Sequence, residues 1–265
     1  LIFTGFVGMI DPERPEVAQA VLEAKAAGIR PMMITGDHRD TAAAIAIRLG
    51  ILNEADKATA VISGSELDAM TDEAFAANVH KYNVYARVAP EHKVKIVTAW
   101  QKKGKVVAMT GDGVNDAPAL KAADIGIAMG ITGTEVSKGA SDMVLADDNF
   151  ATIVHAVEEG RKVFANIQKS LQYLLASNLA EVISIFVMTL LGWNILAPIM
   201  ILWINLVTDT LPAIALGIEP AQKDAMSRQP RGRSASFLSG GVGEAIIWQG
   251  ILQAVIVLSF YGFAL

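Results

Sequence analysis

The residues best suited to chemistry lie in the segment Met109–Leu120, where two aspartates and an asparagine surround two glycines. The apolar run from Lys105 to Met109 predicts a short buried strand, and the glycines permit tight turns directly after it. Such turns bring three oxygen-bearing side chains together at the end of the strand: Asp112, Asn115 and Asp116. Because Mg²⁺ takes one or two carboxylates besides phosphate oxygens and water, the pattern predicts a magnesium-phosphate site. Taken alone, the motif also fits a polar surface turn.

Composition divides the chain into a polar part and an apolar part. Of the 265 residues, 52% are hydrophobic and the mean hydropathy is +0.40, which is too apolar for an ordinary soluble domain. The apolar excess begins after residue 170. We therefore expect a soluble part at residues 1–160 and a membrane part at residues 161–265. The chain starts at Leu1 without a signal peptide, and we expect it to be a piece of a longer protein.

Charge and cysteine content exclude several other classes of protein. The net charge is -5 and the sequence has no long basic run, so nothing favours nucleic acid as a partner. The chain has no cysteine, which excludes disulfide scaffolds and thiolate metal sites.

The soluble part repeats one pattern, a short apolar strand followed by a polar loop and a helix, which is typical of an α/β fold. The predicted strands are Ile29–Ile34, Val84–Ala86, Lys105–Met109, Ile125–Ala128 and Met143–Leu145. The predicted helices lie near Thr41–Leu49, Glu91–Gln101 and Ala117–Ala122. Parallel strands in such a Rossmann-like sheet end at one edge, where ligands bind. We therefore expect convergence of five features at that edge: Thr35, Asp37, Arg87, Lys93 and the Asp112 loop.

This group of side chains suits phosphoryl transfer, in which the protein positions groups and neutralises charge on the transferred oxygens. Lys93 and Thr35 are the candidates for holding phosphate, beside Mg²⁺ bound by Asp112 and Asp116. Singly, Lys93 also fits a solvated helix lysine, and the Thr35 turn also fits a helix N-cap.

Three apolar segments are long enough to cross about 30 Å of hydrocarbon, which takes about 20 helical residues. We place them near residues 173–193, 195–218 and 243–265. Basic residues precede the first segment and separate the second from the third: Arg161, Lys162, Lys169, Lys223, Arg228, Arg231 and Arg233. Positive-inside weighting therefore places the soluble part in the cytoplasm of a multi-pass membrane protein. A buried hairpin of a soluble core is the alternative for the first two segments.

Polar residues recur on one helical face in the first two apolar segments: Asn178 and Glu181, then Asn205, Thr208 and Asp209. Acids in hydrocarbon are costly and commonly mark an ion path. Pro212 has no amide hydrogen and leaves the Thr208 carbonyl without its helical partner. An unwound turn with a bare carbonyl beside these side chains predicts an oxygen cage for Ca²⁺. Interhelical hydrogen bonding is the alternative for the Asn and Thr side chains.

The motifs occur in an order that resembles the carboxyl-terminal part of a P-type ATPase, in particular the calcium pumps of the sarcoplasmic/endoplasmic-reticulum type. The matching stretches are Asp11–Arg14, Met33–Asp37, Ala86–Val88, His92–Lys93, Met109–Leu120, Gly126–Gly130, Met143–Phe150, Ser177–Glu181 and Leu202–Asp209. The resemblance implies a phosphorylation domain of haloacid-dehalogenase-like fold, followed by the fifth, the sixth and most of the seventh transmembrane helix of the family.

The resemblance also implies a role for each candidate residue. Asp112 and Asp116 are similar to the Mg²⁺ ligands, Asn115 lies beside the transferred phosphate, and Lys93 contacts phosphate. The residues that match nucleotide- or phosphate-binding positions are Thr35, Gly36, Asp37 and Arg87. Those that match the calcium sites are Asn178, Glu181, Asn205, Thr208 and Asp209. Mn²⁺ remains an alternative to Ca²⁺, because both are hard divalent ions.

The chain lacks the Asp-Lys-Thr-Gly-Thr and Thr-Gly-Glu motifs of the family. The resemblance therefore implies part of an ATP-driven Ca²⁺ pump whose phosphorylated aspartate lies outside this chain. The expected partners are membrane lipid and the remaining nucleotide-binding, actuator and transmembrane parts. In the family, the missing strand lies in the middle of the sheet, so we expect an unpaired strand edge and no ATP hydrolysis by this polypeptide alone.

Three alternatives stay open. They are a pump for another cation, a membrane-anchored dehalogenase-like phosphatase, and a truncated non-catalytic product that binds a full-length pump.

Overall fold

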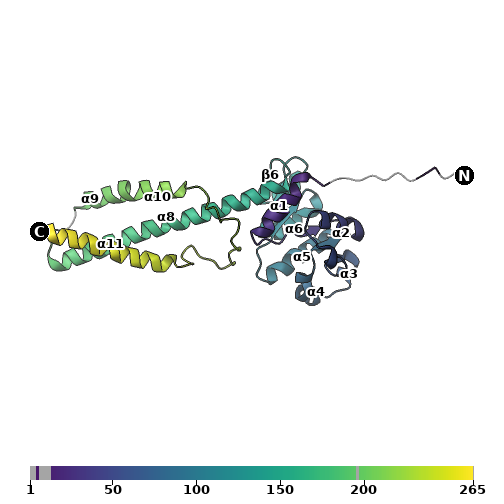
Figure 1. Cartoon of the computed structure of the whole chain (residues 1–265), viewed down its shortest axis with the longest axis horizontal. Coiled ribbons are helices and arrows are strands. Elements are labelled where there is room, and N and C mark those ends of the chain that lie inside the picture. Colours follow the sequence, from purple (N-terminus) through teal and green to yellow (C-terminus); the bar gives the residue numbers. More distant parts are fainter. Residues whose placement is uncertain (1–3, 6–12, 195–196, 265) are drawn as a thin grey trace. The chain divides into compact units, whose positions relative to one another are not determined.

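The computed structural model describes residues 4–5, 13–194 and 197–264, which form two compact units (Figure 1). The first unit extends to Ala156 and includes Met226–Arg233. The second contains Val157–Ala225 and the residues from Ser234 onward. The predicted boundary at residue 160 lies within one long helix, α8 (Phe150–Leu191), which contributes to both units.

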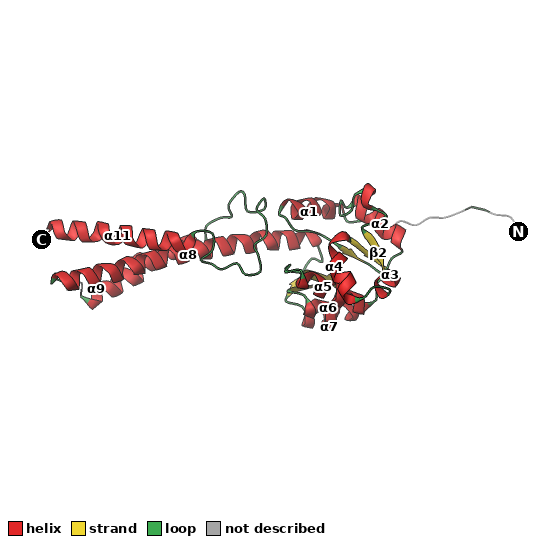
Figure 2. Cartoon of the chain, turned by 90° about the horizontal axis from the view of Figure 1, so that it is seen from below, coloured by secondary structure: helices red, strands yellow, loops and turns green. Residues whose placement is uncertain are grey.

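The first unit contains two three-stranded sheets in which every strand pair is parallel, as expected for the α/β pattern (Figure 2). One sheet has the order β1-β3-β2, made of Met33–Ile34, Val84–Ala86 and Val61–Ser63. The other has the order β4-β5-β6, made of Ala108–Gly111, Ile125–Met129 and Met143–Leu145. Tyr85 lies opposite both Ile34 and Ile62, which places the ends of β1 and β3 next to each other.

Helices connect the parallel strands and bury the apolar side chains. They are α1 (Pro15–Ala26), α2 (Arg39–Arg48), α3 (Gly64–Asp68), α4 (Asp72–Asn78), α5 (Pro90–Lys102), α6 (Ala117–Ala122) and α7 (Glu135–Ala140). One hydrophobic cluster contains Val97 of α5, Met109 of β4 and Leu120 of α6, with Ile34 of β1 packed against it. Both sheets therefore share apolar contacts with the same region of core.

Two strands are shorter than the sequence predicted. Ile29, the first residue of the predicted strand, still belongs to the turn that ends α1, because its amide donates to the Ala24 carbonyl at 2.9 Å. Pro31 follows and has no amide to donate to a neighbouring strand. Similarly, the Lys105 amide donates to the Trp100 carbonyl at 3.2 Å and closes α5, so that β4 begins only at Ala108.

The second unit contains three helices long and apolar enough to cross a membrane, among the residues that the structure describes. The first is α8, which has 42 residues and begins well before the predicted residue 173. The second consists of α9 (Pro198–Trp203), a π-helical turn (Ile204–Asp209) and α10 (Thr210–Gly217), and the third is α11 (Val242–Ala264). The predicted ends at residues 195 and 265 lie outside the described residues.

Individual contacts join the long helices within the second unit. Gly250 of α11 lies against Leu179 of α8, and an added Cβ at this glycine would approach the leucine side chain to 2.8 Å. Tyr261 of α11 donates its hydroxyl to the Asn194 carbonyl at 2.9 Å. Large apolar side chains elsewhere on these helices, such as Phe260 and Trp203, are exposed, as expected of surfaces that face lipid.

Candidate functional sites

The Asp112 loop joins β4 to a 3₁₀ turn (Val114–Asp116) that leads into α6. Asp116 is only 5% exposed, and its Oδ2 accepts hydrogen bonds from the amides of Asp112 at 3.2 Å and Gly113 at 3.1 Å. An added Cβ at Gly111 would lie 2.4 Å from the Asp116 Cβ. Glycine is therefore required at position 111, and Asp116 determines the path of the loop.

Lys93 lies in the first turn of α5 and forms an ion pair with Oδ1 of Asp116. Burial alone disfavours the charged carboxylate of Asp116. The Lys93 ammonium and the two loop amides outweigh that effect and hold the pKa of Asp116 below its ordinary value. The structure thus joins two of the predicted site residues in one charged pair, in which both Asp116 oxygens are already hydrogen-bonded.

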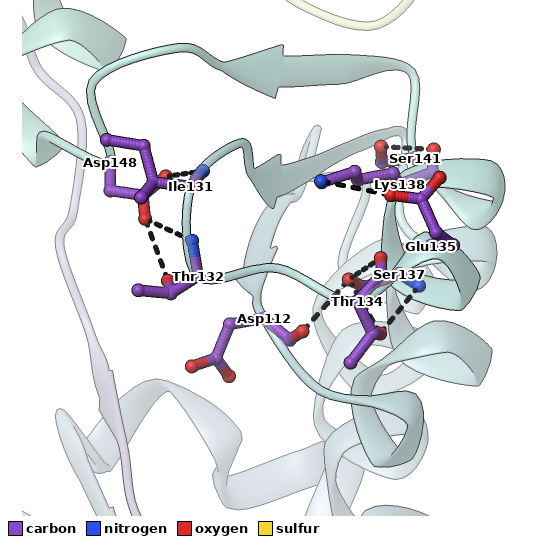
Figure 3. Close-up of polar contacts among 9 residues, drawn as sticks. All are labelled: Asp112, Ile131, Thr132, Thr134, Glu135, Ser137, Lys138, Ser141 and Asp148. Carbon is purple, nitrogen blue, oxygen red and sulfur yellow. Dashed lines mark hydrogen bonds and ion pairs between the residues drawn. The ribbon is translucent and has the colours of Figure 1, made fainter.

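Asp112 is arranged differently from Asp116. Its exposed carboxylate makes no hydrogen bond or ion pair with the part of the chain that the structure describes (Figure 3). Its backbone carbonyl accepts hydrogen bonds from the Thr134 amide at 2.8 Å and the Ser137 hydroxyl at 2.9 Å. A backbone held in place with an open carboxylate fits a single protein ligand to Mg²⁺.

The described residues contain no group of three or more His, Cys, Asp or Glu side chains arranged to hold a metal. A Mg²⁺ ion that keeps its waters and phosphate ligands needs no such group. Asn115, the third predicted side chain of the loop, is exposed and makes no side-chain hydrogen bond within the described ranges.

A second polar group lies where β1 and β3 end. The Thr35 amide donates to the Tyr85 carbonyl at 2.9 Å, and the Thr35 hydroxyl donates to the Asp37 carboxylate at 2.9 Å. The Arg87 amide donates to the Asp37 carbonyl at 3.1 Å. Arg87 has a φ of 50°, a left-handed conformation that is uncommon for a residue other than glycine. The structure therefore brings Thr35, Asp37 and Arg87 together, with Gly36 exposed between the first two.

His92, next to Lys93, has a structural role that the sequence did not predict. Its Nδ1 accepts a hydrogen bond from the Ala89 amide at 2.9 Å, and its Nε2 lies 2.8 Å from the Asp68 carboxylate. The imidazole thereby accepts the N-cap amide at the first turn of α5, whereas Ala89 has no side-chain acceptor to complete a reciprocal capping box. Its position, three residues after the N-cap, was a usable signal, although Glu or Gln is the usual residue there.

In the second unit, Glu181 of α8 and Asn205 of the π-helical turn are in contact. The side-chain amide of Asn205 donates hydrogen bonds to the two Glu181 carboxylate oxygens, at 3.1 Å and 3.4 Å. Asp209 is 4% exposed, and its Oδ2 has no hydrogen-bond partner among the described residues. Asn178 and Thr208 are exposed, and their side chains make no hydrogen bond within those residues. The arrangement sets Glu181 against the π-helical turn and leaves one acidic oxygen, on Asp209, open to a ligand within the described residues.

The expected unwound turn with a bare carbonyl is wrong in two details. Residues Ile204–Asp209 are π-helical, a form that often occurs at functional sites. The Thr208 carbonyl is also not bare, because the Tyr173 hydroxyl of α8 donates to it at 2.9 Å. Pro212 removes the helical donor, and a side chain from the neighbouring helix replaces it.

Two family models match the chain. The model described as haloacid dehalogenase-like hydrolase matches residues 4–124, and the one described as cation transporting ATPase, C-terminus, matches residues 193–265. Together with the parallel sheets of the first unit, the first match confirms the predicted dehalogenase-like fold.

Three curated relatives are similar over most of this chain. Calcium-transporting ATPase 1 of Bacillus cereus is 54% identical over 259 residues, and a calcium-transporting ATPase of Listeria monocytogenes is 50% identical over 259 residues. Both alignments cover 97% of this chain but 29% of the relative. The endoplasmic reticulum calcium ATPase of Aspergillus fumigatus is 51% identical over 238 residues, which are 89% of this chain and 24% of the relative. The chain therefore spans less than a third of the length of these relatives.

Proposed function

We propose that this chain, which belongs to the family of P-type calcium-transporting ATPases, supplies the magnesium-phosphate site and part of the cation path of an ATP-driven Ca²⁺ pump. The observation that carries the proposal is the Lys93–Asp116 pair beside the open carboxylate of Asp112. The pump forms an aspartyl-phosphate on a residue outside this chain.

Lys93 neutralises negative charge on the transferred phosphate, because its ammonium is held at the end of the sheet by Asp116. Asp116 acts mainly through the loop and Lys93, since both of its oxygens are already hydrogen-bonded. Asp112 supplies the carboxylate for Mg²⁺, and Asn115 lies beside it for contact with phosphate. Bound Mg²⁺ adds positive charge that stabilises the transferred phosphoryl group.

The polar residues at the ends of β1 and β3 bind ATP. The Thr35 hydroxyl and the Arg87 guanidinium are donors suited to phosphate oxygens. Gly36 and Asp37 complete this surface, and the Asp37 carbonyl holds the backbone of Arg87 in its left-handed conformation.

The transported Ca²⁺ binds in the second unit to oxygens of five side chains: Asn178, Glu181, Asn205, Thr208 and Asp209. Two observations support this assignment: the contact between Glu181 and Asn205, and the Asp209 oxygen that has no partner among the described residues. Mn²⁺ is the alternative cargo. The phosphate site faces the cytoplasm, and the nucleotide-binding, actuator and remaining transmembrane parts of the pump are the partners of this chain in the lipid bilayer.

Phosphoenzyme trapping tests the proposal. The complete coding sequence that contains this chain is expressed, incubated with Mg²⁺ and ATP labelled on its γ-phosphate, and quenched in acid. We expect label on the protein only when Ca²⁺ is present, and none on the chain expressed alone. A complete protein that incorporates no label with any divalent cation contradicts the proposal. If the label depends on Mn²⁺ and not on Ca²⁺, the transported ion is Mn²⁺ and the rest of the proposal stands.

A further inference from the structure

The loop of residues 130–134, between β5 and α7, is fixed at both ends (Figure 3). At the first end, the Asp148 carboxylate accepts hydrogen bonds from the Ile131 amide at 2.9 Å, the Thr132 amide at 2.8 Å and the Thr132 hydroxyl at 2.8 Å. At the second end, the Thr134 amide donates to the Asp112 carbonyl. The loop thus connects Asp148 to the backbone of the proposed Mg²⁺ ligand.

Asp148 is well suited to hold this loop. It is 8% exposed and has a left-handed φ of 50°, so the chain around it has adopted an uncommon backbone conformation. Burial raises the pKa of its carboxyl, but the hydrogen bonds from Ile131 and Thr132 outweigh this and lower the pKa to about 2. Asp148 is therefore a charged acceptor at neutral pH.

The loop itself has little freedom to take another path. An added Cβ at Gly133 would lie 1.9 Å from the Met129 carbonyl oxygen, and one at Gly130 would lie 2.5 Å from the Leu145 carbonyl oxygen. The Ser137 hydroxyl, which is fully buried, accepts a hydrogen bond from the Thr134 hydroxyl and lies 2.9 Å from the Asp112 carbonyl. A change at Asp148 is therefore transmitted to Thr134 by closely packed backbone.

The direction of the Asp112 carboxylate depends on its backbone, because the carboxylate contacts no other side chain in the described part of the protein. That backbone is held from one side by Asp116, which accepts the Asp112 amide, and from the other by Thr134 and Ser137. We propose that Asp148 is a positioning residue for Asp112, acting through the 130–134 loop to set the affinity of the site for Mg²⁺. This inference rests on the proposed function, in which Asp112 binds that ion.

The substitution that tests it is Asp148→Asn. Asparagine has the same size and tolerates the left-handed conformation, but one of its two terminal atoms donates. It can therefore accept the amide of Ile131 or that of Thr132, but not both. The matched control is Asp147→Asn. Asp147 is exposed, and its carboxylate contacts the Asn149 amide and the Thr152 hydroxyl, outside the loop.

Hydrogen exchange of the purified chain gives the first readout. In Asp148→Asn we expect amides of residues 130–134 and of residues 111–116 to exchange roughly tenfold faster, as on losing one hydrogen bond to a charged group. Amides of β2 and β3 report intact folding and stay unchanged, and Asp147→Asn changes neither segment. Faster exchange at 130–134 without any change at 111–116 overturns the proposal, as does no change at either.

The Mg²⁺ dependence of phosphoenzyme formation gives the second readout, in the complete pump. Asp148→Asn should raise the Mg²⁺ concentration for half-maximal phosphoenzyme several-fold, and Ser137→Ala should raise it less, because the Thr134 amide still holds the Asp112 carbonyl. If Asp148 has a purely structural role, Asp148→Asn lowers the amount of phosphoenzyme but leaves the Mg²⁺ concentration for half-maximal phosphoenzyme unchanged. That result overturns the proposal. If the unaltered pump forms no phosphoenzyme, the proposed function fails, and the exchange result still decides the positioning role.

Discussion

At the scale of single residues, each buried carboxylate of the proposed sites is stabilised by few contacts. Removing one of those contacts should therefore change stability or cation dependence measurably. Asp116 is buried, and its carboxylate is bonded to the Lys93 ammonium and to two backbone amides. Asp209 is also buried, but one of its carboxylate oxygens has no hydrogen-bond partner among the described residues. The first arrangement is stable without a ligand. The second is costly unless a cation, a proton or water reaches the oxygen.

The Lys93–Asp116 pair should make the stability of the first unit depend on pH. The folded-state pKa of Asp116 is lowered, so the unfolded chain binds more protons in acid. The stabilisation is therefore present above the unfolded pKa of about 3.9 and is lost as the pH falls through the folded pKa. The substitution Lys93→Met should lower the melting temperature at pH 7. It should also make the melting temperature fall less steeply as the pH is lowered.

Thermal unfolding of the chain at pH 2 to 7, followed by circular dichroism, checks this prediction. Lys95→Met is the control, because Lys95 lies on the same helix and pairs with the exposed Asp72 instead. Equal acid slopes in unaltered chain and Lys93→Met would show that the pair does not control stability.

Asp209 should govern the cation dependence of the pump. Asp209→Asn removes a buried negative charge from the proposed Ca²⁺ cage, so we expect the Ca²⁺ dependence of ATP turnover to be lost. Glu244→Gln is the control, since Glu244 is an exposed acid in the first turn of α11. Ca²⁺-activated turnover that is the same in Asp209→Asn and the unaltered pump would remove Asp209 from the cation site.

At the scale of elements, the bond between Tyr173 and the Thr208 carbonyl connects α8 to the π-helical turn. Tyr173→Phe removes only the hydroxyl, and an interhelical hydrogen bond in a membrane contributes about 0.6 kcal/mol on average. We therefore expect the Ca²⁺ concentration for half-maximal turnover to rise about threefold, because the turn that carries Asn205 and Asp209 loses a support.

The control for this prediction is Tyr261→Phe. That change removes a comparable hydroxyl bond, to the Asn194 carbonyl, away from the π-helical turn. Titration of ATPase activity with Ca²⁺ measures both variants. A rise of similar size in both would assign the effect to general loosening of the helices.

The sequence predicted elements well where apolar runs were bounded by turn residues. β3, α6 and β6 have the predicted limits, because each lies between polar or glycine-containing segments. The start of α8 was not predicted. Its first part carries charged residues, and hydropathy locates only the apolar portion of a helix that continues beyond it.

Side-chain partners were harder to predict than elements. The Lys93–Asp116 pair joins residues 23 positions apart, yet both lie in motifs that suggested phosphate chemistry. Asp148 and the 130–134 loop are 16 or 17 positions apart, and no periodicity or spacing relates them. The Tyr173 hydroxyl likewise meets the Thr208 carbonyl only because two helices pack together.

At the scale of the whole molecule, the first unit has two sheets where the resemblance implies one. β1 pairs only with β3, and β4 only with β5, within the described residues. The amides of Met33 and Thr35 both donate toward the β3 side, to the carbonyls of Asn83 and Tyr85. Because alternate residues of a strand bond to opposite sides, the Ile34 amide points to the open edge.

The two open edges border the same apolar core, since Ile34 and Met109 belong to one cluster. A strand contributed by another part of the proposed pump would pair with that edge of β1 and accept the Ile34 amide. Hydrogen exchange should therefore be fast at Ile34 in this chain and at least roughly tenfold slower in the complete pump. The Thr35 amide, already bonded to Tyr85, is the internal control and should change much less. Equal exchange at Ile34 in both proteins would mean that the two sheets stay separate, and that the phosphate site must be completed by loops alone.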